Sequence, residues 1–313
     1  MSSTTAPGVA FPATLTFKRS LRRPRLAAYA LLAPSAVFLI GFTYWPVAQV
    51  VAGSLSVHAF GGAARLGLGN YARLFADAQY AHAIANNLIY AAGTILPSLV
   101  LALGFALGLR ESTRLSAALR TLLVLPLLIP LVAAASLFVF IFLPGAGLLD
   151  YYLARLGPVF ARWAQTNWLG DPSLALGSIV AITVWKNTGY YLLFFLAGLA
   201  GIPQDMLDAA RIDGAGAWAR FRHVTLPLLG PTLAFVLVIA VLNALTQVDH
   251  VVVMTQGGPS DSTMLVLYDI YQQAHQNYDI GLASAATVVS VGFLFALSVV
   301  SLRTLERGIH YEA

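Results

Sequence analysis

Cysteine is absent from this 313-residue sequence, and lysine occurs only twice, at Lys18 and Lys186. Without cysteine there is no disulfide, no thiolate metal site and no cysteine nucleophile. Neither lysine follows the glycine of a phosphate-binding loop (GxxxxGK and then Ser or Thr), so a nucleotide site of that kind is excluded. HExxH and GxSxG motifs are also missing, and the six histidines are scattered. These absences argue against an enzyme.

Charge is scarce as well. Only 10% of the residues are Asp, Glu, Lys or Arg, whereas 58% are hydrophobic. Soluble domains usually carry about 25% charged residues. Long uncharged runs remain, and about 20 residues are enough for a helix to cross a bilayer core of about 30 Å. Backbone groups in lipid must be satisfied internally, so such runs form helices. The sequence therefore predicts an all-α membrane protein with six transmembrane helices, near residues 27–50, 86–109, 119–142, 174–199, 228–249 and 282–303.

The net charge of +5 is distributed unevenly. Thirteen Lys and Arg residues lie in the two tails and the even-numbered loops, four lie in the odd-numbered loops, and Lys186 is the eighteenth. Basic residues are retained on the cytoplasmic side. We therefore expect both termini in the cytoplasm, a basic and partly disordered tail over residues 1–25, and one membrane domain over 26–313. The basic excess is explained by topology, so no nucleic acid partner is expected.

The positions of the carboxylates argue against a transporter driven by a proton gradient. All thirteen Asp and Glu residues fall in the expected loops or at helix ends. Transporters that use a proton gradient usually bury carboxylates within the membrane. The chain thus lacks both a nucleotide site and an evident proton relay. If it transports a solute, we expect the energy to come from another subunit. A stand-alone gradient-driven transporter or channel is the alternative.

Charge is concentrated in one stretch of this otherwise apolar chain, residues 205–227, which read DMLDAARIDGAGAWARFRHVTLP. Pro203 suits the first turn of a helix, and Asp205 favours the positive end of the helix dipole. Gly214 can adopt a left-handed conformation and end the helix. The pattern predicts a short helix in a cytoplasmic loop. Such a helix can insert into a groove on another protein, or it can be an ordinary solvated loop helix.

The same residues carry a resemblance. DAARIDGAGAWARFRHVTLPLLGP resembles the EAA signature of the permease subunits of bacterial ABC importers, although its first acid is Asp rather than Glu. YWPVAQVVAGSLS, NWLGDPSLAL and VWKNTGYYLLFFLAGLAGIP also resemble parts of that family. TQGGPSDSTMLVLYDIYQQAHQNYDIGLASAATVV resembles the ending of its carbohydrate-uptake branch, which includes sugar and glycerol-3-phosphate permeases.

The resemblance implies a chain that performs no chemistry and forms half of a translocation pathway at the bacterial inner membrane. Its implied partners are a second homologous permease, two ATPase subunits that hold ATP and Mg, and an extracytoplasmic substrate-binding protein received near residues 250–281. No cofactor is implied in this chain itself. The residues implied to couple to the ATPase are Asp208, Ala209, Ala210, Asp213, Gly214, Ala215, Phe221 and Pro227.

Polar residues within the expected spans are candidates for the substrate pathway. Lys186 is the only charge in mid-helix, where it either lines the path or bonds to helix carbonyls. The other candidates are Asn187, Tyr190, Asn243, Thr246, Gln247 and Asp249. Spacings of three and four place Asn243, Thr246 and Gln247 on one helix face. Polar side chains also hold helices together in membranes, at about 1 kcal/mol each, so a structural role stays open.

Overall fold

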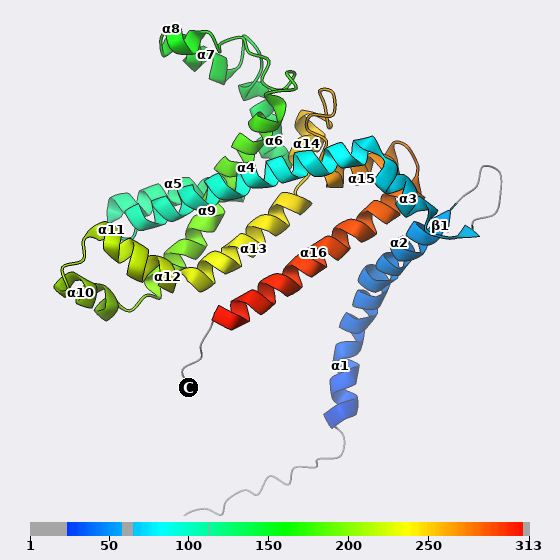
Figure 1. The fold of residues 1–313 in the computed structure, drawn as a ribbon, viewed down its shortest axis with the longest axis horizontal. Helices are drawn as coiled ribbons and strands as arrows, with labels where there is room; N and C mark the ends of the chain where they lie inside the picture. The colour runs from blue at the N-terminus through cyan, green and yellow to red at the C-terminus, as the bar shows by residue number, and fades with distance from the viewer. Residues whose placement is uncertain (1–23, 58–64, 112, 309–313) are drawn as a thin grey trace, which may run out of the picture. The chain divides into compact units, whose positions relative to one another are not determined.

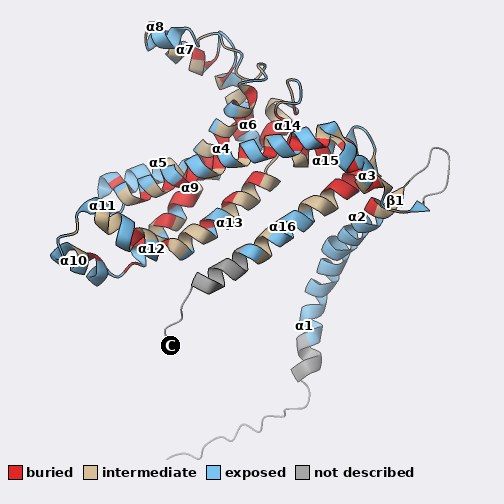
Figure 2. Cartoon of the chain, in the orientation of Figure 1, coloured by how far each residue is buried: buried red, intermediate tan, exposed pale blue. Residues whose placement is uncertain are grey.

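The computed structural model describes residues 24–57, 65–111 and 113–308, with side chains over 29–57, 65–111 and 113–300 (Figure 1). The chain divides into two units, residues 1–49 and 50–313. In the first unit, α1 (Pro24–Leu39) continues through a π-helical turn η1 (Ile40–Tyr44) into α2 (Trp45–Leu55). Its described side chains are exposed up to Gln49, as the pale blue helix in Figure 2 shows. A helix this apolar is suited to lipid rather than water.

The second unit is also helical. Its helices are α3 (Gly69–Ala76), α4 (Ala78–Gly108), α5 (Arg114–Leu128), α6 (Leu131–Ile141), α7 (Leu148–Arg155), α8 (Pro158–Ala161), α9 (Ala175–Ala200), α10 (Gln204–Ile212), α11 (Ala217–Arg220), η2 (Phe221–Thr225), α12 (Leu226–Leu228), α13 (Gly230–Thr246), α14 (Asp249–Met254), α15 (Val266–His275) and α16 (Ile280–Gly308). One antiparallel strand pair, β1 (Ser56–Val57) and β2 (Arg65–Leu66), is present in the described part.

Five helical segments of the described residues are long and apolar enough to cross a membrane: Tyr29–Leu55, Ala78–Gly108, Ala175–Ala200, Gly230–Met254 and Ile280–Val300. They overlap five of the six predicted spans. The predicted helix over 119–142 is instead a pair, α5 and α6, bent by 100° at a short break. Pro130 stands at the break, and it has no N–H to continue the hydrogen-bond ladder of α5. The all-α class is therefore confirmed, with five spans, or six if the bent pair is one.

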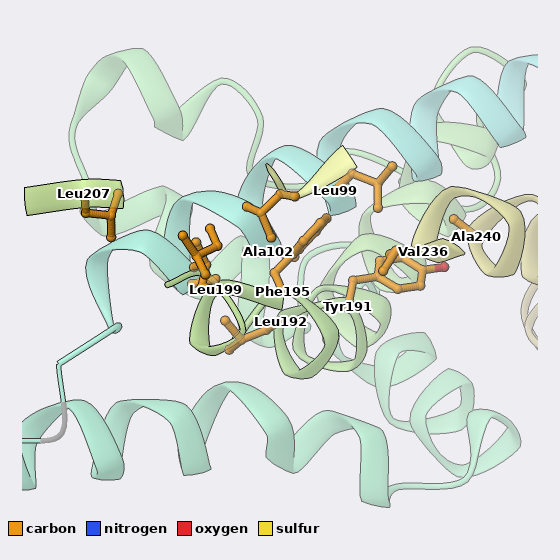
Figure 3. Packing of buried hydrophobic residues seen from close by; sticks show 12 residues of the cluster. Leu99, Ala102, Tyr191, Leu192, Phe195, Leu199, Leu207, Val236 and Ala240 are labelled. Atoms are coloured by element: carbon orange, nitrogen blue, oxygen red, sulfur yellow. The ribbon is translucent and has the colours of Figure 1, made fainter. Parts of the chain in front are cut away.

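The central core lies where α4, α9 and α13 meet (Figure 3). Small residues on α4, such as Ala102 and Ala106, face the larger Tyr191 and Phe195 of α9, and all four are buried. Small side chains let the two backbones approach closely, which is how helices gain dispersion energy in a bilayer. Leu207 of α10 joins the same cluster and is also buried. The core thus anchors the segment that leaves the membrane bundle after α9.

A second buried cluster lies toward the other end of these helices. It joins Tyr90 of α4, Ile179 of α9 and Ala244 of α13 to Met264 and Tyr268, which come from the region of α14 and α15. A third cluster packs α3 against the start of α16. The connection between α13 and α16 is therefore folded onto the bundle. In Figure 2 its helices show red buried positions, whereas α10 and α11 show few.

Candidate functional site

The predicted short helix after the fourth span is present. α10 covers Gln204–Ile212 and follows Pro203, whose backbone is extended. Gly214 has φ of +76°, the left-handed conformation that the sequence predicted there. The Gly214 N–H donates to Arg211 O and the Ala215 N–H to Ala210 O, both at 3.0 Å, so the last carbonyls of the helix are satisfied. The chain then re-enters the bundle through α11, η2 and α12.

Residues 204–227 are called the coupling segment below, after the role that the sequence predicts for them. Its inner side is fixed to the bundle by Leu207, which is 4% exposed, and by the buried Thr225. The Arg220 Nη1 atom donates to Ala215 O at 2.9 Å and ties α11 to the turn that follows α10. The rings of Trp218 and Phe221 are tilted by 36° to each other, with centroids 5.4 Å apart. The segment is therefore an ordered projection, and its conformation is set by its own contacts.

The outer side of the coupling segment is open. Ile212 is 87% exposed and Trp218 is 73% exposed, and Met206 is half exposed. Asp208 forms an ion pair with Arg211 at 2.7 Å on the same surface. Among the other predicted coupling residues, Ala209, Asp213, Gly214 and Pro227 are exposed, and Ala210, Ala215 and Phe221 are half-buried. Met206, Ile212 and Trp218 lie outside the candidate membrane spans, and exposed apolar side chains in such a segment are typical of a surface that another protein covers.

Lys186 is buried in the middle of α9, and its surroundings explain how a charge is tolerated there. Its Nζ atom donates to Ile129 O at 2.5 Å and to Pro126 O at 3.1 Å. Both carbonyls lie at the break between α5 and α6, where the helical ladder is interrupted. Pro126 O also accepts from the Ile129 N–H at 3.3 Å, and the ammonium adds a bond to it and one to Ile129 O in a medium where unpaired carbonyls cost free energy. Of the two sequence interpretations, the carbonyl-bonding one is the arrangement observed.

Gly189 allows that arrangement. A Cβ atom at this position would lie 2.0 Å from Leu123 O and 2.9 Å from Leu123 C, so any side chain would push α5 away from α9. Glycine at a helix crossing permits this close approach. The contact stands three residues after Lys186, on the same pair of helices. The sequence analysis missed this role, since a glycine within an apolar span carries no signal of what it touches.

The remaining pathway candidates do not form one cluster. Asn187 is buried, and Tyr190 is half-buried in an aromatic row with Phe194. The Asn243 Nδ2 atom donates to the Tyr191 hydroxyl at 3.3 Å, which links α13 to α9. Such bonds hold helices together, as the structural interpretation expected.

The expected shared face on the fifth span is only partly present. α13 ends at Thr246, and Gln247 has an extended backbone, so only Asn243 and Thr246 share the helix. The Thr246 hydroxyl donates to Leu242 O of its own helix. Asp249 begins α14 and is exposed. The sequence pattern missed the break because no proline or glycine marks it.

A buried polar group of three residues was also missed. The Tyr90 hydroxyl lies 3.0 Å from Thr183 Oγ1 and 3.0 Å from His250 Nε2, which connects α4, α9 and α14. All three residues are buried. A buried network of this kind fixes the relative position of its helices because each partner is costly to leave unpaired. Each residue comes from a different helix, so spacing gives no indication of the group.

The connection between α6 and α9 is organised around one carboxylate. Asp150 is buried, and it accepts from the N–H groups of Gly145 and Gln165 and from the Trp168 indole, at 2.7, 2.9 and 3.0 Å. Burial by itself would raise the pKa of Asp150, but these three bonds favour the charged form and hold the pKa below its ordinary value. Among the described residues, no group of three or more His, Asp or Glu could hold a metal ion.

Comparison with known proteins gives consistent results. A family model for the binding-protein-dependent transport system inner membrane component matches residues 98–311. The sn-glycerol-3-phosphate transport system permease protein UgpA of Escherichia coli (strain UTI89 / UPEC) is 32% identical over 301 residues, which cover 95% of this chain and 100% of that protein. UgpA of Salmonella typhimurium is 33% identical over 301 residues, with the same coverage.

A solved structure has the same fold. A bacterial ABC transporter involved in the import of the acidic polysaccharide alginate aligns with a TM-score of 0.78, over 90% of this chain and 96% of that one. The sequence identity is 22%, so this similarity concerns the fold alone. A second structure, of a bacterial alginate ABC transporter in complex with a periplasmic protein that holds an alginate pentasaccharide, aligns with a TM-score of 0.74.

Proposed function

Because this chain belongs to the family of inner-membrane components of binding-protein-dependent transport systems, we propose that it is a permease subunit that forms half of the translocation pathway of an ATP-driven importer. Its expected partners are a second homologous permease, two ATPase subunits that bind ATP and Mg, and an extracytoplasmic binding protein. Both termini and the coupling segment then face the cytoplasm, in line with the distribution of basic residues.

The observation that carries the proposal is the open side of the coupling segment. The segment is ordered, anchored by the buried Leu207, and yet exposes Ile212 and Trp218. The exposed ion pair of Asp208 with Arg211 belongs to the same segment. A rigid projection transmits displacement, and an apolar face with a polar rim is what a protein interface uses. We therefore assign this face to a cleft on the ATPase subunit, with Ala209 and Gly214 at the contact.

The solute class follows from the relatives. The relatives named above are permeases for sn-glycerol-3-phosphate, and the structural neighbour imports alginate. We propose a sugar or a glycerol-3-phosphate-like compound, which passes between this chain and the second permease along Asn187, Tyr190, Asn243, Thr246, Gln247 and Asp249. Lys186 borders this path, and its two bonds hold the bent α5 and α6 beside it.

The decisive experiment is a paired substitution. Ile212→Asp places a charge on the open face, and its burial against the ATPase without a partner costs several kcal/mol. We expect more than about a hundredfold loss of ATP-dependent uptake and of ATPase activity recovered with the purified chain, as that cost implies. Ala209→Asp should act in the same direction.

The matched control is Leu66→Asp, which is also far exposed, at 84%, but lies in β2. It should leave recovery of the ATPase unchanged. Full recovery of the ATPase with both Ile212→Asp and Ala209→Asp would disprove the docking role. Transport by the purified chain alone, in vesicles without ATP, would instead support the gradient-driven alternative.

A further inference from the structure

A cleft of about 540 Å³ lies between the loop that follows α4, the helix α5, the end of α9 and the start of α10. Its walls include Arg110, Arg120, Leu196, Ala200, Pro203 and Gln204. The two arginines are the only charged residues among those that line it. The candidate spans Ala78–Gly108 and Ala175–Ala200 both end at this cleft. It therefore lies at the depth where the hydrocarbon of a bilayer gives way to the headgroups.

Arg120 is held in place from one side. Its Nε atom donates to Leu109 O at 2.9 Å, and its Nη2 atom donates to the same carbonyl and to Glu111 O. No hydrogen bond within the described residues uses Nη1. The guanidinium is thus oriented by the backbone of the loop that joins α4 and α5, and it keeps two N–H groups for a ligand.

Arg110 makes fewer hydrogen bonds than Arg120. Its one hydrogen bond within the described residues is a long one, from Nη2 to Gln204 Oε1 at 3.5 Å. The two ion pairs of the described residues are Arg73–Asp279 and Arg211–Asp208, so neither arginine of the cleft has a carboxylate within 4.0 Å there. Two guanidinium groups that share one cleft without a counter-ion repel each other, and an anion relieves that repulsion.

We infer that this cleft binds the phosphate of an anionic phospholipid headgroup. Phosphate is the anion whose oxygens match the planar N–H groups of arginine best. The half-buried Leu196 and the small Ala200 provide an apolar wall beside the charges, which suits an amphiphile better than a free ion. The inference rests on the proposed function in one respect, the cytoplasmic placement of this end, where the leaflet carries anionic lipid.

The test uses the purified full-length chain in detergent, with native mass spectrometry after exchange into phosphatidylglycerol or phosphatidylcholine. The wild type should retain phosphatidylglycerol in preference to phosphatidylcholine. Each arginine near an anionic surface is worth about a fivefold change in affinity. The double variant Arg110→Gln, Arg120→Gln should therefore bind phosphatidylglycerol about 25-fold more weakly.

Two further variants separate binding from folding. Arg114→Gln removes a charge from the first residue of α5, outside the cleft, and should retain phosphatidylglycerol like the wild type. Arg110→Gln alone disturbs only the long bond to Gln204, so it tests the site even if the loss of Arg120 unfolds the loop. Equal retention of phosphatidylglycerol by Arg110→Gln and wild type would overturn the inference.

Competition identifies the source of the phosphate. Millimolar inorganic phosphate should leave bound phosphatidylglycerol in place, and if it displaces the lipid completely, the lipid assignment is wrong and the site takes a free anion. If the wild type binds both lipids equally and Arg110→Gln loses the ATPase instead, the arginines pair with a carboxylate of that subunit, which also overturns the inference. Because lipid retention does not depend on uptake, a failure here leaves the proposed function standing.

Discussion

The two connections at opposite ends of α13 differ sharply in how far their side chains are buried. In the coupling segment, residues 204–227, Ile212 and Trp218 are largely exposed. The buried Leu207 packs against the bundle and anchors the segment. Residues 249–279, called the packed loop here, bury Met264, Tyr268 and Asp269. Hydrogen bonds from α4 reach into the packed loop. Asn86 Nδ2 donates to Asp261 O, Gln79 Nε2 to Asp269 Oδ1, and the Val266 N–H donates back to Asn87 Oδ1.

The difference separates a connection that is largely buried within this chain from one that leaves large apolar side chains exposed. The packed loop buries several of its large side chains and bonds to α4 within this chain, so much of its conformation is stabilised by the fold itself. The coupling segment satisfies its backbone but leaves its large apolar side chains in the open. Substitutions in the packed loop should therefore lower stability, whereas substitutions in the coupling segment should lower association with a partner.

The largest contrast is expected from two aromatic residues. Tyr268→Ala removes a side chain that is 2% exposed and should lower the free energy of unfolding by about 3–5 kcal/mol through the cavity it leaves. Trp218→Ala removes a larger ring that is 73% exposed and should change it by less than about 0.5 kcal/mol. Chemical unfolding of the purified chain in detergent measures both. Similar values for the two variants would abolish the distinction between the regions.

Two glycines give the next contrast. Gly214 and Gly257 have φ of +76° and +80°, so an alanine at either position adopts a strained backbone at a cost of about 1–2 kcal/mol. Around Gly214 a Cβ atom meets nothing within 4 Å, whereas at Gly257 it would lie 2.8 Å from Tyr268 Cε1. Gly257→Ala should therefore destabilise by about 1–3 kcal/mol more than Gly214→Ala. Thermal unfolding of the two variants side by side provides the measurement, and equal shifts would contradict the packing argument.

The smallest contrast concerns the pH dependence of stability. Burial raises the pKa of Asp269 above its ordinary 3.8, although bonds from Gln79 and Gln273 oppose the rise. A carboxyl with a raised pKa binds more protons when folded, so its contribution to stability falls as pH rises from about 3.8 through the folded pKa, by at most about 1.4 kcal/mol per pH unit. Asp269→Asn should remove this slope from unfolding curves measured across that range.

Its control is Gln276→Asn, just beyond α15, which carries no titrating group and should keep the slope. In the coupling segment, Asp208→Asn breaks an exposed ion pair worth at most about 1 kcal/mol. A slope that survives Asp269→Asn would mean that another group of the packed loop titrates.

Local features of the fold could be predicted from the sequence. The fourth span was expected over 174–199 and is found at Ala175–Ala200, because the uncharged runs on both sides of Lys186 together have the length of a membrane helix. The helix of the coupling segment and the left-handed Gly214 also follow from local rules. The second span begins earlier than expected, at Ala78, because Asp77 caps a helix longer than a bilayer requires.

Features that join distant residues could not be predicted. Pro126 and Pro130 lie within the third predicted span, but prolines are tolerated in membrane helices, so they give no measure of the 100° bend. Lys186 was singled out by its charge, yet its carbonyl partners lie 57 and 60 residues earlier in the chain. The arginine cleft brings together Arg110, Arg120 and Gln204 in the same way, through packing that no short pattern encodes.

The distance in sequence between Lys186 and the carbonyls to which it donates also has a consequence for biosynthesis. Pro126 leaves the ribosome 60 residues before the ammonium that will bond to it, and chains are made from the N-terminus at about 5–20 residues per second. During those seconds Pro126 O has the Ile129 N–H as a partner, but neither it nor Ile129 O has the bond from Lys186. The bend between α5 and α6 therefore gains its bonds to Lys186 only late in assembly, after the fourth span has been made.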